Sequence, residues 1–389
     1  MLANEINDTL FAALASTRAT LCLDCGKCTS LCPVARFNRS YSPRRMILRA
    51  AQSREDGLLK DSALWDCLTC KLCEERCPSQ VDYVGLMQKL RTMAQQAGGK
   101  GLCSHGEALH AMMRIMATPE IKPQRLDWLS EGLQTSSTSD VLLFVGCAPF
   151  FDAFFADLDV HVLDAVKSSI RLLNRMGIAP RVLADERCCG HDLLWSGDEE
   201  NFRRLAQYNL GQFKQAGIKK ILTACPECAV TLQQTYAEYF GGLNYQVQHT
   251  IEFLDQNQSK AFTPAQSKHK QVTYQDPCRL GRYRKTYAAA RNVLRHIAAT
   301  EVVEMPRSGK RAICCGVANW MNCSNYSKQI QVNRLREAKQ TGAEILATAC
   351  PKCQIHFKCA MKDKNLGEDY RIEVKDVVTI AAESVISKQ

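Results

Sequence analysis

The sequence lacks a long apolar run, a secretory leader pattern and a dinucleotide-binding fingerprint. A spanning helix needs about 18 apolar residues, and the most apolar stretch, Val141–Phe155, is broken by Pro149 and Asp152. The chain begins MLANEINDTLFAALAS, without basic residues before an apolar core, so we expect no secretory signal. No G-x-G-x-x-G motif follows an expected strand. We therefore expect a cytoplasmic protein with no direct membrane span, in which any membrane contact is made through a partner subunit.

Cysteine is what the sequence has in excess, with 21 among 389 residues. Disulfide scaffolds are small secreted chains, so we expect most of these cysteines to be metal ligands. The formal charge of +10 counts every cysteine as neutral, whereas iron-bound thiolates are negative. No basic stretch is interleaved with aromatic residues, so we expect no nucleic-acid partner.

Two cysteine runs near the N-terminus share one pattern. The runs CLDCGKCTSLCP (22–33) and CLTCKLCEERCP (67–78) both read C-x₂-C-x₂-C-x₃-C-P. In bacterial ferredoxins the fourth cysteine of such a run ligates the other cluster. Zinc would need only four ligands in two pairs, so the doubled run favours two cubane [4Fe–4S] clusters. The expected ligand sets are Cys22, Cys25, Cys28 and Cys77 for one cluster, and Cys67, Cys70, Cys73 and Cys32 for the other.

The rest of the chain contains a five-cysteine pattern twice: Cys, a gap, Cys-Cys-Gly, a gap, and Cys-Pro-x-Cys. Its members are Cys147, Cys188, Cys189, Cys225 and Cys228, then Cys278, Cys314, Cys315, Cys350 and Cys353. Recurrence at such similar spacing indicates a duplication. Adjacent cysteines form a disulfide poorly, and zinc ligand pairs are normally two to four residues apart.

Strand and helix patterns alternate within each copy, which predicts small parallel sheets with ligands at the carboxyl ends of the strands. The expected strands are Val141–Gly146, Arg181–Ala184, Lys219–Ala224, Gln271–Asp276, Glu301–Pro306 and Glu344–Ala349. The expected helices are His161–Gly177, Asn201–Gly217, Arg282–Ala299 and Tyr326–Gly342, with Tyr41–Gln52 between the two N-terminal cysteine runs. We therefore expect an α+β multidomain fold: a mainly helical domain at 1–100, a linker at 101–139, and α/β domains at 140–258 and 270–389.

The repeated motif resembles the cysteine-rich (CCG) domain of the heterodisulfide reductase family. The same domain occurs in iron–sulfur subunits of glycolate, lactate and glycerol-3-phosphate dehydrogenases. The stretch YQDPCRLGR (Tyr274–Arg282) is similar to the family's lead-in to its second unit. A two-cluster ferredoxin block followed by two CCG units resembles the fused iron–sulfur subunit of that family, over nearly the whole chain except 98–140.

The resemblance implies that each five-cysteine set is catalytic and holds a non-cubane [4Fe–4S] cluster. Adjacent thiolates can bind or bridge two irons of such an opened cluster, and a zinc ion in one unit is the alternative. The implied function is that of an oxidoreductase subunit that passes electrons through two cubane clusters to two non-cubane clusters, where a disulfide is reduced or formed.

A second function fits the same motifs: an electron-transfer subunit without its own substrate. It would link a flavoprotein dehydrogenase, or a large bifurcating complex of the benzoyl-CoA reductase type, to quinone or ferredoxin. In relatives that only pass electrons, one unit often lacks some cysteines, and both are complete here. Either function requires flavoprotein or haem/quinone-reacting partner subunits, and the first also requires a small-molecule disulfide or thiol.

Three cysteines lie outside these sets: Cys103, Cys323 and Cys359. We expect them to be buried structural thiols.

His191 directly follows the first Cys-Cys-Gly motif. We expect it to form a hydrogen bond to the cluster, in preference to donating a proton to a leaving thiolate.

Overall fold

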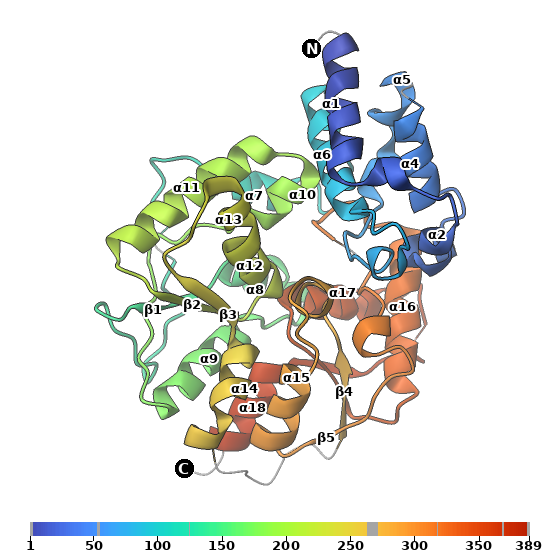
Figure 1. Cartoon of the computed structure of the whole chain (residues 1–389). Helices are drawn as coiled ribbons and strands as arrows, with labels where there is room; N and C mark the ends of the chain where they lie inside the picture. The colour runs from blue at the N-terminus through green and yellow to red at the C-terminus, as the bar shows by residue number, and fades with distance from the viewer. Residues whose placement is uncertain are drawn as a thin grey trace. The chain divides into compact units, whose positions relative to one another are not determined.

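One part of the chain is mainly helical, and the other contains two small parallel sheets together with further helices (Figure 1). The computed structural model describes residues 3–52, 55–123, 125–262, 271–316, 318–367 and 369–386. The first compact unit comprises Met1–Ala117, Gly190–Arg204 and Gly316–Gln331, and the second comprises Thr118–Cys189, Leu205–Cys315 and Val332–Gln389. The domain division expected from the sequence stays a prediction, because these units are built from segments that are not contiguous.

The first unit is mainly helical, which confirms the expectation for the N-terminal region. Its helices are α1 (Ala3–Ser16), α2 (Lys27–Leu31), α3 (Pro33–Phe37), α4 (Pro43–Ala51), α5 (Glu55–Leu58), α6 (Tyr83–Gln96), α7 (Ala108–Met116) and α10 (His191–Ser196), with 3₁₀ turns at Ala19–Leu21, Ser62–Trp65 and Glu74–Arg76. Capping residues define two of the starts: the Ser42 hydroxyl accepts from Arg45 N, and the Asp82 carboxylate accepts from Gly85 N. Helices α1, α4 and α6 pack together, as the upper part of Figure 1 shows.

The second unit contains two parallel sheets, as expected. The first sheet has the order β1-β2-β3 (Val141–Phe144, Lys220–Thr223, Gln246–His249), and the second has the order β5-β4-β6-β7 (Glu301–Val302, Gln271–Gln275, Ile345–Thr348, Glu373–Asp376). Strands β1, β2 and β3 correspond in order and register to β4, β6 and β7, because Thr223 lies opposite His249 and Thr348 lies opposite Asp376. We call Val141–Ala261 the first repeat and Gln271–Ile386 the second repeat.

Helices cover the sheets and join the two repeats. They are α8 (Ala148–Phe154), α9 (Leu163–Arg175), α12 (Pro226–Val230), α13 (Tyr236–Phe240), α14 (Thr250–Ala261), α15 (Ala289–Asn292), α17 (Pro351–Lys362) and α18 (Val377–Ile386), with 3₁₀ turns at Ala156–Leu158 and Gly309–Arg311 and π turns at Thr231–Thr235, Arg279–Tyr283 and Val293–Ile297. Helices α11 (Glu199–Gln215) and α16 (Asn325–Lys339) begin in the first unit and end in the second. Leu172 of α9 and Ile251 of α14 share one buried core with Val272 of β4 and Ile380 of α18. The two repeats are therefore one folded body.

Several expected elements differ from those observed. Arg181–Ala184 is not a strand: Arg181 forms a single parallel bridge with Leu142. The helix expected at Arg282–Ala299 is divided, because a π turn ends at Tyr283 and α15 begins at Ala289. Strands β3 and β7 were not predicted, since QVQH and EVKD alternate polar with apolar side chains and give no continuous apolar run.

The expected linker at 101–139 contains helix, and helix also continues past the expected end of the first α/β domain at residue 258. The segment 101–139 includes α7, and the division between the units falls after Ala117. Helix α14 extends through 250–261, and residues 263–270 lie outside the described part of the chain.

Candidate metal centres

The two ferredoxin-type runs have the same backbone conformation. Residues on either side of the second cysteine are left-handed in both: Asp24 and Gly26 in one run, Thr69 and Lys71 in the other, with φ between 47° and 75°. Successive turns of this kind direct backbone amides into a concavity that suits anions. Non-glycine residues are strained in this region, so the pattern at Thr69 and Lys71 marks a shape required by function.

The first expected cubane set lines one cavity. Cys22, Cys25, Cys28 and Cys77 all border it, together with Cys73. Cys25 is exposed and the other three members of the set are partly buried. The Val81 amide lies 3.4 Å from Cys77 Sγ. Cys77, the fourth cysteine of the second run, therefore lies beside the first three cysteines of the first run, as the predicted ligand set requires.

The second expected cubane set is more deeply placed. Burial raises the pKa of Cys73, and neighbouring Cys70, Cys67 and Cys32 add to that rise. Cys67 and Cys70 are buried.

Arg91 supplies a positive charge beside this second set. Its buried guanidinium donates 2.8 Å hydrogen bonds to the carbonyls of Leu64, Cys67 and Trp195. The charge of Arg91 also partly offsets the rise that burial causes in the pKa of Cys67. Sequence reasoning missed Arg91, because an arginine on a helix gives no sign of burial.

Each Cys-Pro-x-Cys motif opens a helix at the end of a strand. Cys225 precedes α12 and Cys350 precedes α17, with proline at the first helical position, where its missing amide is tolerated. The second cysteine then lies in the first turn, where the helix dipole favours a thiolate. The motif thus places two sulfur ligands at the carboxyl edge of a parallel sheet.

In the first repeat the structure brings the five cysteines together. Contact with Cys188 raises the pKa of Cys147 and of Cys189. Cys228 Sγ lies 3.6 Å from Cys189 Sγ, and Cys225 also raises the pKa of Cys228. Sulfur atoms this close, most of them buried, form a donor set suited to iron.

In the second repeat the equivalent five cysteines also lie close together, but their pKa values shift in different directions. Contact with Cys314 raises the pKa of Cys278. Interactions with Cys314 and Cys353 lower the pKa of Cys315 to about 6. His356 Nδ1 lies 3.2 Å from Cys315 Sγ. For Cys189, the matching residue of the first repeat, the backbone carbonyl accepts a hydrogen bond from the Tyr236 hydroxyl.

The two cysteine sets are joined by the variable residues of the Cys-Pro-x-Cys motifs. Glu227 holds this position in the first repeat and Lys352 in the second, and Lys352 Nζ lies 2.6 Å from Glu227 Oε2. Both residues are buried. The charges of Cys225 and Glu227 raise the pKa of Cys350, although burial is the larger cause. The sets are therefore close neighbours.

A layer of polar groups fixes the first Cys-Cys pair. Glu186 accepts hydrogen bonds from Val145 N and Gly146 N, and Arg125 donates to the Glu186 carbonyl at 3.0 Å. Burial raises the pKa of Glu186 to about 7. The Tyr236 hydroxyl donates to the Cys189 carbonyl at 3.1 Å.

Steric constraints explain why a glycine follows each Cys-Cys pair. Gly190 has φ 81° and Gly316 has φ 98°, a left-handed region in which glycine is favoured. A Cβ at Gly190 would lie 2.7 Å from the Phe202 ring, and one at Gly316 would lie 2.8 Å from Ser327 O. Neighbouring segments therefore require glycine at both positions.

The three remaining cysteines are not all buried, contrary to expectation. Cys323 is exposed, and Cys103 and Cys359 are partly buried. His191 is buried at the start of α10.

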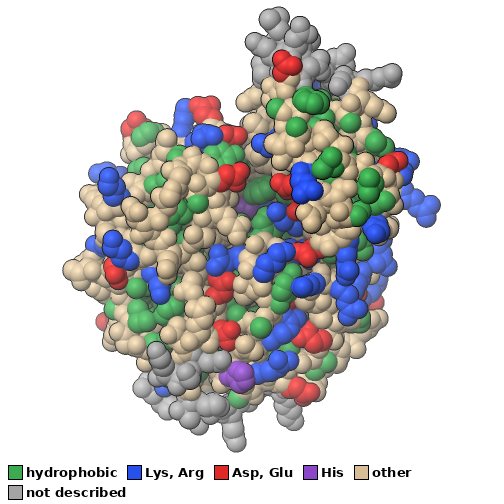
Figure 2. All heavy atoms as spheres, viewed as in Figure 1, with side chains coloured by type: hydrophobic (Ala, Val, Ile, Leu, Met, Phe, Trp, Pro, Cys, Tyr) green, Lys and Arg blue, Asp and Glu red, His purple; other side chains and the backbone are tan. Residues whose placement is uncertain are grey.

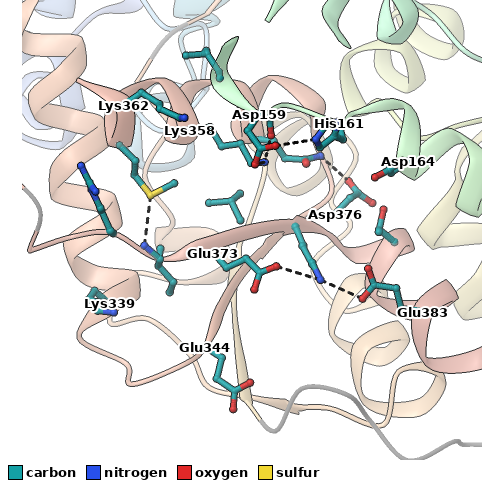
Figure 3. Close-up of a pocket in the computed structure, with 18 of the residues that line it drawn as sticks. Asp159, His161, Asp164, Lys339, Glu344, Lys358, Lys362, Glu373, Asp376 and Glu383 are labelled. Carbon is teal, nitrogen blue, oxygen red and sulfur yellow. Dashed lines mark hydrogen bonds and ion pairs between the residues drawn. The ribbon is translucent and has the colours of Figure 1, made fainter. Parts of the chain in front are cut away.

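A pocket of about 820 Å³ lies elsewhere in the second unit (Figure 3). Figure 3 shows Asp159 close to both His161 and Lys358, and His161 Nε2 lies 3.0 Å from Asp159 Oδ1. Lys375 Nζ lies 3.2 Å from Glu373 and 3.3 Å from Glu383. These charges pair with one another, so the pocket does not present one sign of charge to a ligand.

The face shown in Figure 2 is not purely basic. Acidic side chains lie among the Lys and Arg side chains on the face shown in Figure 2. Among the helices of the described ranges, none is both long enough and apolar enough to cross a membrane.

Known families match both cysteine regions. The 4Fe-4S dicluster domain matches residues 18–81, and the cysteine-rich domain matches residues 141–233 and 272–358.

Three curated relatives are similar to this chain over most of its length. One subunit of the dihydromethanophenazine:CoB–CoM heterodisulfide reductase of Methanosarcina barkeri is 28% identical, over 94% of this chain and 93% of that protein. One subunit of the fumarate reductase (CoM/CoB) of Methanothermobacter marburgensis is 25% identical, over 92% of this chain and 72% of that protein. EtfAB:quinone oxidoreductase of Syntrophomonas wolfei is 25% identical, over 93% of this chain and 58% of that protein. The chain therefore contains a dicluster ferredoxin domain and two cysteine-rich domains, and along most of its length it is similar to an iron–sulfur subunit of heterodisulfide reductase, as the sequence resemblance implied.

Proposed function

We propose that this subunit carries electrons to a site at which a disulfide is reduced or, in the opposite direction, formed. The observation that supports this function most directly is the pair of complete five-cysteine sets. Each gathers at the carboxyl edge of its own sheet, and the Glu227–Lys352 ion pair joins the two. Relatives that only pass electrons often lack some cysteines in one unit, whereas both sets are complete here.

The proposed ligands follow the two kinds of motif. The cubane [4Fe–4S] clusters take Cys22, Cys25, Cys28 and Cys77, and Cys67, Cys70, Cys73 and Cys32; the non-cubane clusters take Cys147, Cys188, Cys189, Cys225 and Cys228, and Cys278, Cys314, Cys315, Cys350 and Cys353. When bound, the clusters would carry electrons one at a time, and those in the repeats would supply iron with an affinity for sulfur. One disulfide, two electrons and two protons give two thiols, and a partner subunit provides the electrons.

Buried arginine side chains surround and position the cysteines of the second repeat. Contact with Cys314 and burial raise the pKa of Cys278, and the charges of Arg279 and Arg282 partly offset that rise. Both arginines are buried. Arg282 donates to the Ala312 carbonyl at 2.7 Å, which anchors the residue two positions before Cys314. These contacts hold the sulfur atoms in place before a ligand arrives, and burial keeps water from them.

We propose that electrons enter the subunit at the cluster of the first ferredoxin set. Cys25 is exposed, and the neighbouring Leu21 and Leu23 are 53% and 69% exposed. Cys67 and Cys70 of the second set are buried. An exposed donor set beside apolar side chains suits contact with a flavoprotein or a haem/quinone-reacting subunit, so we propose that such a partner docks there.

The second candidate function is electron transfer without a substrate of its own. The similarity to EtfAB:quinone oxidoreductase over 93% of this chain supports it. In that case electrons pass from a flavoprotein, or within a bifurcating complex of the benzoyl-CoA reductase type, toward quinone or ferredoxin.

Metal content and a thiol response separate these functions. The measurement is iron and zinc per chain in anaerobically purified protein, with EPR spectra of the oxidised protein before and after a thiol is added. Four four-iron clusters would give about sixteen irons, and a new thiol-dependent paramagnetic signal supports disulfide chemistry. Full iron without any thiol response supports pure electron transfer. About eight irons with zinc in a repeat contradicts both cluster assignments there.

A further inference from the structure

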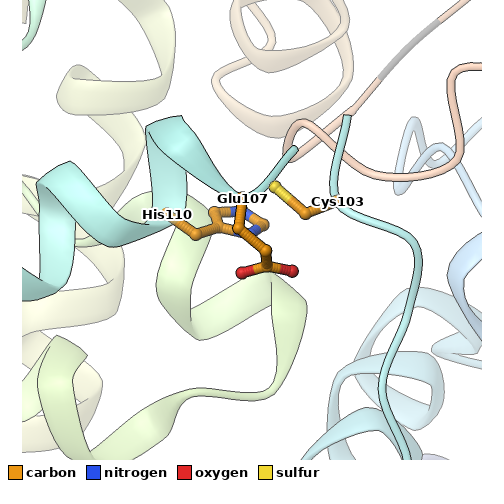
Figure 4. Close-up of side chains that lie close together, drawn as sticks. All are labelled: Cys103, Glu107 and His110. Carbon is orange, nitrogen blue, oxygen red and sulfur yellow. The ribbon is translucent and has the colours of Figure 1, made fainter. Parts of the chain in front are cut away.

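Three side chains with metal-ligating atoms lie together in the first unit, and none of them belongs to a cysteine set described above (Figure 4). Cys103 comes from the extended stretch before α7, Glu107 is the residue before the helix, and His110 lies in its first turn. One ligand atom from each lies within 4.8 Å of the other two. A tetrahedral zinc ion with bonds of about 2.0–2.3 Å holds its ligand atoms about 3.3–3.8 Å apart. A small side-chain adjustment therefore brings these three atoms to zinc geometry.

The backbone fixes the position of the Cys103 sulfur. Cys103 and Met321 form an antiparallel bridge. On either side of it, Ser104 N donates to Trp320 O at 2.7 Å, and Asn322 N donates to Leu102 O at 2.8 Å. Cys103 therefore sits in a short ladder and not in a free loop.

The hydrogen bond of His110 sets the tautomer that a ligand binding through Nδ1 would need. The side chain is 1% exposed, and Nε2 lies 2.9 Å from the carbonyl oxygen of Asn319. A carbonyl only accepts, so Nε2 carries the proton and the neutral ring has its lone pair on Nδ1. Metal-ligating histidines almost always donate their other ring N–H to a carbonyl or carboxylate in this way.

Glu107 is also held by a supporting group. Its Oε2 lies 3.2 Å from Arg114 Nη1, and Arg114 Nε donates to Asp198 Oδ2 at 2.9 Å. The carboxylate has a second oxygen available for an ion. Glu107 has φ 70° and follows left-handed His105 and Gly106, a strained run of the kind found at binding sites.

We propose that Cys103, Glu107 and His110 bind a zinc ion, with water in the fourth position. A thiolate, an imidazole and a carboxylate suit zinc, whereas calcium and magnesium prefer oxygen ligands alone. The charges of one thiolate and one carboxylate balance the dication. Glu107 and His110 border a pocket of about 600 Å³, which gives the ion a way in. The ion would join the stretch before α7 to the first turn of that helix, and the proposal does not depend on the function proposed for the repeats.

The test is zinc binding by the complete, iron-loaded protein purified without oxygen. Wild type is equilibrated with zinc sulfate and dialysed; zinc and iron are then counted, and the zinc X-ray absorption spectrum is recorded. We expect about one zinc per chain, with one sulfur at about 2.3 Å and three nitrogen or oxygen ligands at about 2.0–2.1 Å. Less than a tenth of a zinc per iron-replete chain, or a shell rich in sulfur, would overturn the proposal, because the latter places zinc in a cysteine set.

Two ligand variants and one control make the test specific. Cys103→Ser and Glu107→Gln should each keep their iron and bind zinc at least about tenfold more weakly. Cys359→Ser removes a cysteine outside every proposed set and should bind zinc as wild type does. Glu107 is exposed, so its variant is expected to fold even if Cys103→Ser does not. Wild-type zinc affinity in Glu107→Gln together with an unchanged absorption spectrum contradicts the site.

Discussion

The two repeats have the same strands and the same five cysteines, yet they differ in charge at matched positions. The variable residue of Cys-Pro-x-Cys is Glu227 in the first repeat and Lys352 in the second. The last residue of β3 is His249, and the last residue of β7 is Asp376. All four are buried. The comparison shows that the duplication preserved the donor atoms while the surrounding charges diverged, so the two sets are not electrostatically interchangeable.

The difference extends to the Cys-Cys pairs. In the first repeat contact with Cys188 raises the pKa of Cys189, and Tyr236 donates a hydrogen bond to the Cys189 carbonyl. In the second repeat His356 lies against the Cys315 sulfur itself, and its sulfur neighbours lower the pKa of Cys315. The groups around the two Cys-Cys pairs therefore differ, and four predictions examine this asymmetry.

The largest expected effect is the loss of one cluster without the other. Cys189→Ser and Cys315→Ser should each lose about four of about sixteen irons, and both should abolish the thiol-dependent EPR signal because that signal needs both sets. Iron analysis and EPR of the two variants check this. Cys359→Ser serves as the control and should retain all iron. Full iron content in either set variant would remove that cysteine from the proposed ligands.

The next effect concerns the ion pair between the repeats. Glu227→Gln or Lys352→Met leaves a buried charge unpaired and should lower the free energy of unfolding by about 3–5 kcal/mol. The measurement is anaerobic urea unfolding of both single variants, the double variant and the exchanged pair Glu227→Lys/Lys352→Glu.

The exchanged pair sharpens the comparison. It should recover most of the stability, because the pair is restored, and it should alter the EPR signals of the repeats, because the charges have changed places. Equal losses that simply add in the double variant would show that the two side chains do not interact.

Opposite pH dependences are expected at the ends of β3 and β7. Burial raises the pKa of Asp376 to about 7, so its contribution to stability is present below about pH 4 and is lost as the pH rises through 7. Burial lowers the pKa of His249 to about 4, so its contribution is present above about pH 6.5 and is lost as the pH falls through 4.

Asn variants at the two positions test these signs. Asp376→Asn should gain stability over wild type as the pH rises from 4 to 7, and His249→Asn should gain as the pH falls from 6.5 to 4. Each slope reaches at most about 1.4 kcal/mol per pH unit. Thermal unfolding across this range measures both, and slopes of the same sign would contradict the assignment.

The smallest expected effect tests whether Tyr236 influences the first cysteine set or only packs in the core. Tyr236→Phe removes the hydrogen bond to the Cys189 carbonyl and should cost about 1 kcal/mol. Tyr245→Phe is the matched control, because its hydroxyl bonds the Leu232 carbonyl at 3.3 Å, away from the cysteines. Only Tyr236→Phe should also change the EPR spectrum assigned to the first repeat. Identical spectra in both variants would reduce Tyr236 to a packing role.

Much of the fold could be read from local pattern. The cysteine spacings predicted two ferredoxin-type runs and a duplication, and the family matches confirm the domains that carry them. Strands β2 and β6 were predicted because KILT and ILAT are continuous apolar or β-branched runs. Strands β3 and β7 were missed because their pairing with a neighbour, and not their own composition, makes them strands.

The sequence by itself determined which sulfur atoms are available, because spacing along the chain limits which of them one turn or one strand end can present. Only the tertiary structure decided what surrounds them. Residues far apart along the chain meet there, such as Glu227 with Lys352 and Arg91 with Cys67. Their burial sets the pKa values and unites the repeats, because the free energy of a charge depends on the groups that replace water around it.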